Sequence, residues 1–227
     1  MQSWSGSRID SVQNIAGQRV YILVGKDDTI VGPNVTRQAK RLYVDIGGFV
    51  AGANVPYVEL DAAGHTFRTD FNGASDGPCD FSLPPYISNC RFDGAGAALP
   101  WRYGKRRAPN TGKLDGSLIA LDQTPFVGPG LGMGNTGWIH LAASYAGARR
   151  CSLYVALHGS QQGYATLGTY FVNNAGYNRW ADTNDMIVLY PQASASLLNL
   201  HSCWDWVGRY GCDFDQKSGV RTKAIRR

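Results

Sequence analysis

The sequence lacks the features that mark several common classes of protein. No uninterrupted apolar run approaches the about 20 residues that a membrane-spanning helix needs, and we therefore expect no membrane partner. None of the five cysteines forms a CxxC pair, which argues against a structural zinc site. Charged residues make up 17% of the chain and hydrophobic residues 44%, a composition typical of a folded domain rather than a disordered one. We expect neither a metal nor a cofactor.

The excess of positive charge is small and clustered. The net charge is +5, and much of it lies in Lys105-Arg106-Arg107 and in four basic residues near the C-terminus. Neither cluster alternates with aromatic residues or belongs to a known nucleic-acid-binding motif, so both are interpreted as solvated loop and tail charges. We expect no nucleic-acid partner.

Two patterns indicate an extracellular protein. Cys79 and Cys90 bracket a short Pro-Pro loop, a spacing suited to a small disulfide-closed loop. Asn34-Val35-Thr36 is a sequon for N-glycosylation. The first ten residues, MQSWSGSRID, contain no charged-then-apolar signal pattern. A secreted protein without a signal predicts that a segment is missing from the N-terminus.

The pattern of apolar residues predicts a parallel α/β arrangement. Residues 20–24 and 54–60 read as strands, and between them an acidic loop precedes a helix that runs from Pro33 to Ile46. A loop with a histidine follows the second strand, so strands and helix alternate as in a parallel sheet. The later elements are predicted as strands at 118–121, 138–141, 151–157 and 185–190, an amphipathic helix at 167–181, a helix opening at the C-terminus, and irregular structure at 70–113. No boundary divides the chain, and a single domain over residues 1–227 is predicted.

Two of these loops carry an acid and a histidine. Asp28 lies in the loop GKDDTIVGP and His65 in AAGHTF, each after a predicted strand. In α/β-hydrolases the acid orients a histidine that deprotonates a serine. Asp28 is preferred over Asp27 because it holds the fourth position of a G-x-x-D-x-x-V pattern that starts at Gly25. Taken alone, the pattern fits an ordinary loop acid and a solvated histidine better than a catalytic pair.

The nucleophile is harder to find. The one literal G-x-S-x-G match is Gly73 to Gly77, but no apolar strand precedes it and no helix follows, so it is rejected as a nucleophile elbow. Ser160, in LYVALHGSQQG, has His158 and Gln162 where an elbow needs glycines. A strand that ends in His-Gly matches instead a loop whose backbone N–H groups form an oxyanion hole. This strand normally precedes the nucleophile, but here it follows both the acid and the histidine. The order of these parts along the chain is therefore rotated relative to that of an ordinary α/β-hydrolase.

Several long segments carry a family resemblance. They are TIVGPNV, AGHTFRTDFNGA, PPYISNCRFDGAGAAL, LYVALHGSQQ, AGYNRWADTNDMIVLYPQA and CWDWVGRYG. The chain resembles circularly permuted, fungal-type poly(3-hydroxybutyrate) depolymerases over nearly its whole length. These are secreted serine esterases of the α/β-hydrolase class. The resemblance implies a circularly permuted α/β-hydrolase-like fold with a mostly parallel sheet, which is incomplete here.

The resemblance also implies roles for individual residues. The triad acid falls on Asp28 and the histidine on His65, and Ser160 occupies the oxyanion-hole position, where its backbone N–H would act. Trp204 and Trp206 are candidates for the ester-binding crevice, although either could equally be a core aromatic. In the family the nucleophile elbow precedes the residues with which this chain begins, so the resemblance predicts a chain that lacks its nucleophile serine.

The cysteines depart from the family pattern. The resemblance retains a Cys79–Cys90 disulfide, but Ser160 stands where the family has a cysteine, which leaves Cys203 without its expected partner. Ser144 likewise stands where a partner of Cys151 is expected. A Cys203–Cys212 bridge is conceivable.

Three hypotheses follow. The first is an incomplete chain of a secreted ester hydrolase that acts on poly(3-hydroxybutyrate) or related short-chain esters, inactive by itself, with a complementing N-terminal segment as a further partner. The second is a non-catalytic module that binds polymer or a hydrophobic ligand. The third is a related feruloyl or acetylxylan esterase.

Overall fold

The computed structural model describes residues 2–147 and 150–227, except for the side chains of residues 146 and 147. The chain forms two compact units, residues 1–106 and residues 107–227. This division does not test the single domain predicted over residues 1–227, which stays a prediction. Within the described residues, no helix combines the length and the apolar character needed to cross a membrane.

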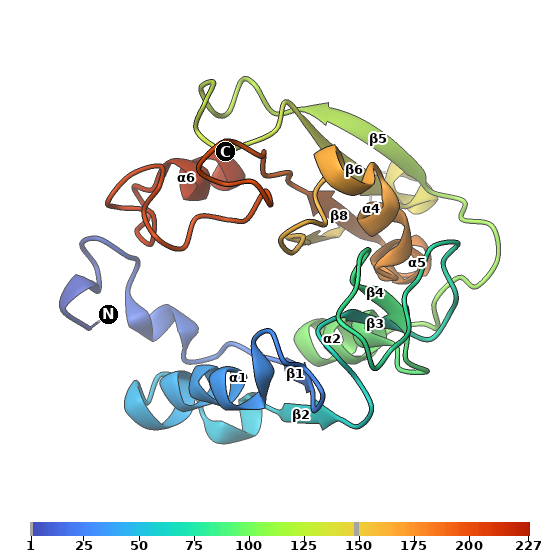
Figure 1. The fold of residues 1–227 in the computed structure, drawn as a ribbon, viewed down its shortest axis with the longest axis horizontal. Coiled ribbons are helices and arrows are strands. Elements are labelled where there is room, and N and C mark those ends of the chain that lie inside the picture. The colour runs from blue at the N-terminus through green and yellow to red at the C-terminus, as the bar shows by residue number, and fades with distance from the viewer. Residues whose placement is uncertain (1, 148–149) are drawn as a thin grey trace. The chain divides into compact units, whose positions relative to one another are not determined.

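The first unit contains the predicted strand–helix–strand succession. Strand β1 (Ile22–Gly25) pairs in parallel with β2 (Tyr57–Leu60), and α1 (Gly32–Arg41) connects them with Pro33 in its first turn (Figure 1). A π-helical turn, η3 (Leu42–Ile46), continues α1 up to Gly47. The predicted order of the elements is confirmed, because the apolar spacing and the glycine stop signal both agree with the tertiary packing.

Residues 70–113 are not irregular throughout, and that expectation is wrong. Strand β3 (Phe67–Thr69) pairs in parallel with β4 (Ile87–Asn89), and α2 (Gly94–Tyr103) follows. The Asp93 carboxylate caps α2 by accepting the N–H of Gly96 at 2.6 Å, as an N-cap residue does. Glycines in the first turn and a proline near its end conceal this helix from pattern reading. The remaining elements of this unit are η1 (Gln2–Trp4), η2 (Val12–Ile15) and η4 (Gly52–Asn54).

The second unit holds a mixed sheet of four strands in the order β5-β6-β8-β7. The strands are β5 (Ser117–Asp122), β6 (Thr136–Leu141), β7 (Ser152–Val155) and β8 (Met186–Tyr190). β7 and β8 are parallel, whereas β6 is antiparallel to both β5 and β8. The predicted strands are confirmed, but among the described residues the strands form separate small sheets rather than one mostly parallel sheet, and the sheet of this unit is mixed. No helix connects β5 to β6, and a direct connection favours antiparallel pairing.

The predicted helix over residues 167–181 is broken. Gly168 and Gly176 adopt positive φ angles of 57° and 81°, which a continuous right-handed helix does not allow. Three short helices replace it, namely α3 (Tyr164–Leu167), α4 (Tyr170–Asn174) and α5 (Tyr177–Thr183). The unit also contains η5 (Ala143–Gly147) and α6 (Val220–Arg226), the latter confirming the predicted C-terminal helix. Its core includes Phe171 of α4, Ala181 of α5, and Val188 and Tyr190 of β8.

Candidate active site

Asp28 and His65 lie side by side in the first unit. Asp28 follows β1 and His65 follows β2, and the carboxyl ends of paired parallel strands lie at the same edge of a sheet. The Asp28 Oδ2 atom is 2.8 Å from Nδ1 of His65. The Asp28 side chain is buried, whereas 42% of the His65 side chain is exposed. The predicted acid and histidine therefore form a pair in which only the imidazole faces outward.

Hydrogen bonds keep the Asp28 carboxyl ionised. Burial by itself would raise its pKa, but the hydrogen bond from His65 and those from the backbone N–H groups of Val31 and Ile30 outweigh burial and hold the pKa below the usual range. Both backbone donors lie 2.9 Å from Oδ1. An ionised Asp28 can only accept, so the proton of a neutral His65 lies on Nδ1 and the lone pair on Nε2. In the described part of the chain, Nε2 has no hydrogen-bond partner.

A close approach of two loops makes this pairing possible. The N–H of Asp27 donates to the carbonyl of Ala63 at 3.0 Å, which joins the acid loop to the histidine loop. At Gly25 a Cβ atom would lie 1.9 Å from the Ala63 oxygen and 2.7 Å from Nη2 of Arg68. No side chain fits there, and the glycine is required because the backbones touch.

Arg68 is hydrogen-bonded to the backbone of the loop that carries His65. Its Nη2 donates to the carbonyl of Gly64 at 2.8 Å, and the residue is buried. Burial lowers the pKa of Arg68, and the neighbouring charge of Asp28 opposes this effect. Pattern reading places Gly25 at the start of the G-x-x-D-x-x-V pattern, but it does not show that a close backbone approach requires glycine there, and it does not identify Arg68.

The rejected G-x-S-x-G match lies in a turn. The N–H of Gly73 donates to the Asp76 carboxylate at 2.7 Å, and that of Gly77 donates to the Ile87 carbonyl at 3.1 Å. No strand enters this segment and no helix leaves it. The secondary structure that a nucleophile elbow requires is therefore missing around Ser75, as predicted.

Ser160 lies in the second unit, in the loop that follows β7. The neighbouring His158 is buried and makes two hydrogen bonds to the backbone. Its Nε2 accepts the N–H of Ala193 at 3.1 Å, and its Nδ1 is hydrogen-bonded to the Gly159 carbonyl at 2.7 Å. Both ring nitrogens of His158 are thus used to hold the turn. Ser160 itself is exposed, and no group among the described residues accepts its backbone N–H. An unpartnered backbone N–H in an exposed residue is compatible with the predicted oxyanion-hole role, which stays a prediction.

The two predicted tryptophans differ in environment. The Nε1–H of Trp204 donates to the His158 carbonyl at 3.0 Å, and its ring lies 5.5 Å from that imidazole. The guanidinium of Arg221 stacks on the ring, 5.7 Å from its centre. These contacts hold Trp204 in place, and its ring also lines a pocket together with Asp205 and Tyr210. Trp206 is 68% exposed. The substrate-binding role of either ring stays a prediction.

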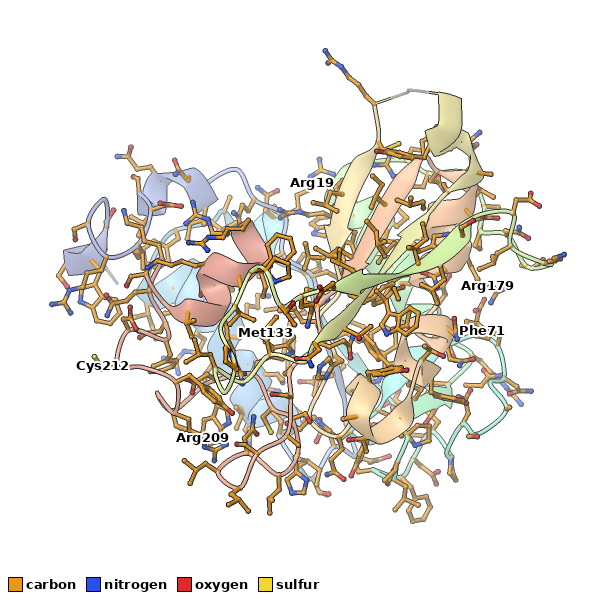
Figure 2. The ribbon with its side chains drawn as sticks, turned by 90° about the horizontal axis from the view of Figure 1, so that it is seen from above. Arg19, Phe71, Met133, Arg179, Arg209 and Cys212 are labelled. Carbon is orange, nitrogen blue, oxygen red and sulfur yellow. A yellow bond between two sulfur atoms is a disulfide. The ribbon has the colours of Figure 1, made fainter. Side chains whose placement is uncertain are left out.

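One predicted disulfide is present. Cys79 and Cys90 are bonded, as expected. Cys203 and Cys212 remain thiols, so the bridge considered between them is wrong. Cys212 is exposed (Figure 2), and Cys203 instead contacts the hydroxyl of Ser160. Ser160 thus occupies the place from which a cysteine would reach Cys203.

A buried acid hydrogen-bonded to a histidine at the ends of two parallel strands is an arrangement found in the α/β-hydrolase class, with which this fold is consistent. No family model matches the sequence. The chain is 49% identical to a polyhydroxybutyrate depolymerase of Talaromyces funiculosus, over 99% of this chain and 69% of that protein. It is 39% identical to a poly(3-hydroxybutyrate) depolymerase of Delftia acidovorans, over 96% of this chain and 43% of that protein.

Two solved structures agree with these sequence matches. One is a serine-to-alanine variant of a PHB depolymerase complexed with an R3HB trimer, with a TM-score of 0.93. The other is the crystal structure of PHB depolymerase from Penicillium funiculosum, with a TM-score of 0.92. Both are 49% identical in sequence, and each match covers 99% of this chain and 73% of the solved chain. The chain therefore belongs to the polyhydroxybutyrate depolymerase family.

Proposed function

We propose that this chain carries the acid and the base of a serine ester hydrolase that acts on poly(3-hydroxybutyrate) or related esters. The observation that supports this proposal is the 2.8 Å contact between Asp28 and His65. In the proposed reaction, Nε2 of His65 takes the proton of a serine hydroxyl as it attacks the ester carbonyl. The ionised Asp28 stabilises the imidazolium that forms. The same proton then passes to the departing alkoxide.

The backbone N–H of Ser160 is proposed to stabilise the tetrahedral oxyanion. Its support is the turn held by His158 and the free exposed donor at the end of β7. A preorganised donor of this kind stabilises the transition state more than the ester itself. The hydroxyl of Ser160 takes no part in the proposed chemistry, because it is directed to the Cys203 thiol.

The attacking serine is proposed to come from a segment other than these 227 residues. The order acid, histidine, oxyanion turn along the chain supports a circularly permuted hydrolase, in which the nucleophile comes before the acid. On this proposal the 227 residues alone do not hydrolyse esters, and the segment with the serine is their partner. The Cys79–Cys90 disulfide supports an extracellular location, since such bonds persist in oxidising compartments.

The substrate class is supported by the relatives, two of which carry poly(3-hydroxybutyrate) or polyhydroxybutyrate in their names. Trp206 supports a polymer contact, because it exposes a large ring in the second unit. The same exposed ring favours the alternative of a non-catalytic polymer-binding module. The two functions differ in whether His65 is needed.

The proposal is tested by supplying a nucleophile serine from a relative. A serine-bearing segment of the fungal relative from outside the matched region is fused to the chain, and hydrolysis of p-nitrophenyl butyrate and of a polyhydroxybutyrate suspension is measured. We expect activity in the fusion and a loss of about 10³-fold or more in His65→Ala. Asp27→Ala is the matched control, since the side chain of this neighbour is exposed and Asp28, not Asp27, bonds the imidazole. A fusion that binds the polymer without hydrolysing it would favour the binding module, and activity that survives His65→Ala would refute the role of His65.

A further inference from the structure

The loop closed by Cys79–Cys90 packs against the backbone that carries His65. The N–H of Gly64 donates to the carbonyl of Cys79 at 2.8 Å. A Cβ atom at Gly64 would lie 3.0 Å from the Phe81 carbonyl carbon and 3.1 Å from the Ser82 hydroxyl oxygen. The loop and the histidine segment are therefore in direct contact, and a side chain at Gly64 would require the loop to shift by a few tenths of an ångström.

Ser82 makes the contact with His65 itself. Its hydroxyl oxygen accepts the backbone N–H of His65 at 2.8 Å. The next N–H, that of Thr66, donates back to the Gly64 carbonyl at 3.0 Å. His65 is thus the central residue of a three-residue turn. Ser82 binds the backbone N–H of His65, which is next to the Cα atom that carries the imidazole.

The loop that carries Ser82 is anchored on both sides. The disulfide joins its two ends. Before the loop, the carbonyl of Pro78 accepts the hydroxyl of the buried Ser88 at 3.2 Å, and the Ser88 hydroxyl lies 2.8 Å from that of Thr66. A serine on a loop held by a disulfide and these hydrogen bonds keeps its hydroxyl oxygen in one position, whereas a serine on an unanchored loop would move with the loop.

We propose that Ser82 is a positioning residue for His65 and that the Cys79–Cys90 loop is the support that holds it. This inference rests on the proposed function. The imidazole must meet Asp28 on one side and a serine hydroxyl on the other, and a misplacement of about 1 Å can lower a rate about 100-fold. Among the described residues no hydrogen bond joins Ser82 to Asp28, and Ser82 acts through the backbone of His65.

The first test uses the 227-residue chain and does not depend on ester hydrolysis. The Nδ1–H proton of His65, hydrogen-bonded to Asp28, is followed by NMR, and its exchange with water is measured. In Ser82→Ala we expect exchange to accelerate about threefold to tenfold, because one hydrogen bond to the turn is lost. Ser82→Thr keeps the hydroxyl and should restore the slow exchange. An exchange rate in Ser82→Ala equal to that of the unchanged chain overturns the proposal.

A matched control is available in the same unit. The hydroxyl of Ser5 accepts the backbone N–H of Val12 at 3.0 Å, which is the same kind of hydrogen bond away from His65. Ser5→Ala should leave the Nδ1–H exchange unchanged, and an equal acceleration in this variant would show that a general loss of stability is responsible. If Ser82→Ala does not fold, backbone hydrogen exchange in the unchanged chain decides instead. An unprotected His65 amide there would overturn the proposal.

The second test separates this inference from the proposed function. In the fusion that carries a nucleophile, Ser82→Ala should lower kcat about tenfold to 100-fold with little change in KM, and Ser82→Thr should restore it. If the fusion hydrolyses no ester but the NMR effect is present, the proposed function fails while the positioning role stands. If the fusion is active and Ser82→Ala retains full kcat, the positioning role fails.

Discussion

The hydroxyl of Ser160 contacts the thiol of Cys203, which lies 43 residues further along the chain. This contact joins the turn after β7 to the segment that carries both tryptophans. Two further hydrogen bonds reinforce it, from Gln161 N–H to the His201 carbonyl at 2.7 Å and from Trp204 Nε1–H to the His158 carbonyl at 3.0 Å. The proposed oxyanion turn is therefore held by a segment distant in sequence.

A cysteine at position 160 should form a disulfide with Cys203. The side chains are already in contact, so Ser160→Cys needs little backbone movement. We expect about 2–4 kcal/mol of added stability from the closed loop, measured by urea unfolding. The chain has three thiols outside its disulfide, and the oxidised variant should titrate two. Four titratable thiols would show that the disulfide has not formed. Ser160→Cys combined with Cys203→Ser cannot form it, and equal stability of this double variant and the oxidised single variant would also contradict the prediction.

Substitutions of the two tryptophans should have different effects on stability and on polymer binding. Trp206→Ala should change the free energy of unfolding by less than about 0.5 kcal/mol, because the ring is exposed, and should weaken adsorption to a polyhydroxybutyrate film. Trp204→Phe removes the hydrogen bond to the His158 carbonyl and should cost about 1 kcal/mol or more of stability. Chemical unfolding and film binding measure the two effects. A large loss of stability in Trp206→Ala would contradict this assignment.

Ionisation of Asp28 should make the free energy of unfolding depend on pH in the acid range. Its folded-state pKa lies below the usual value of about 3.9. The ionised carboxylate therefore contributes stability that is fully present above that value and is lost as the pH falls through the lowered pKa. Asp28→Asn should cost about 2 kcal/mol at pH 7, and this difference should shrink below about pH 4. Asp27→Asn, at the exposed neighbour, is the control. A difference that is constant with pH would contradict the prediction.

The glycine at the end of β1 should tolerate no side chain. A Cβ at Gly25 would overlap the Ala63 carbonyl, and Gly25→Ala should cost about 1–3 kcal/mol as the two loops separate. It should also weaken the Asp28–His65 hydrogen bond, seen as faster exchange of the Nδ1 proton. At Gly17 an added Cβ would meet no atom within 4 Å, so Gly17→Ala is the matched control. Equal stabilities of the two variants would refute the close approach.

Local patterns predict much of the first unit. The alternation of apolar strand, acidic loop, helix and second strand is visible in residues 20–60, because each element buries a face with a regular period. This order alone places Asp28 and His65 at neighbouring strand ends, and the structure confirms their contact. The helix at Gly94–Tyr103 is missed since its glycines and proline are poor helix formers, and capping by Asp93 with burial of Ala95 and Leu99 overrides propensity.

The sequence by itself determined the strand–helix–strand succession, the acid–histidine order and the loop bounded by Cys79 and Cys90, because these follow from short-range spacing. Only the tertiary structure decided that Gly25 must be a glycine, that Ser82 accepts the His65 N–H, and that Trp204 donates to the His158 carbonyl whereas Trp206 is exposed. Each of these depends on which distant backbones come within a few ångströms of one another. Local hydrophobic periodicity carries no information about such approaches.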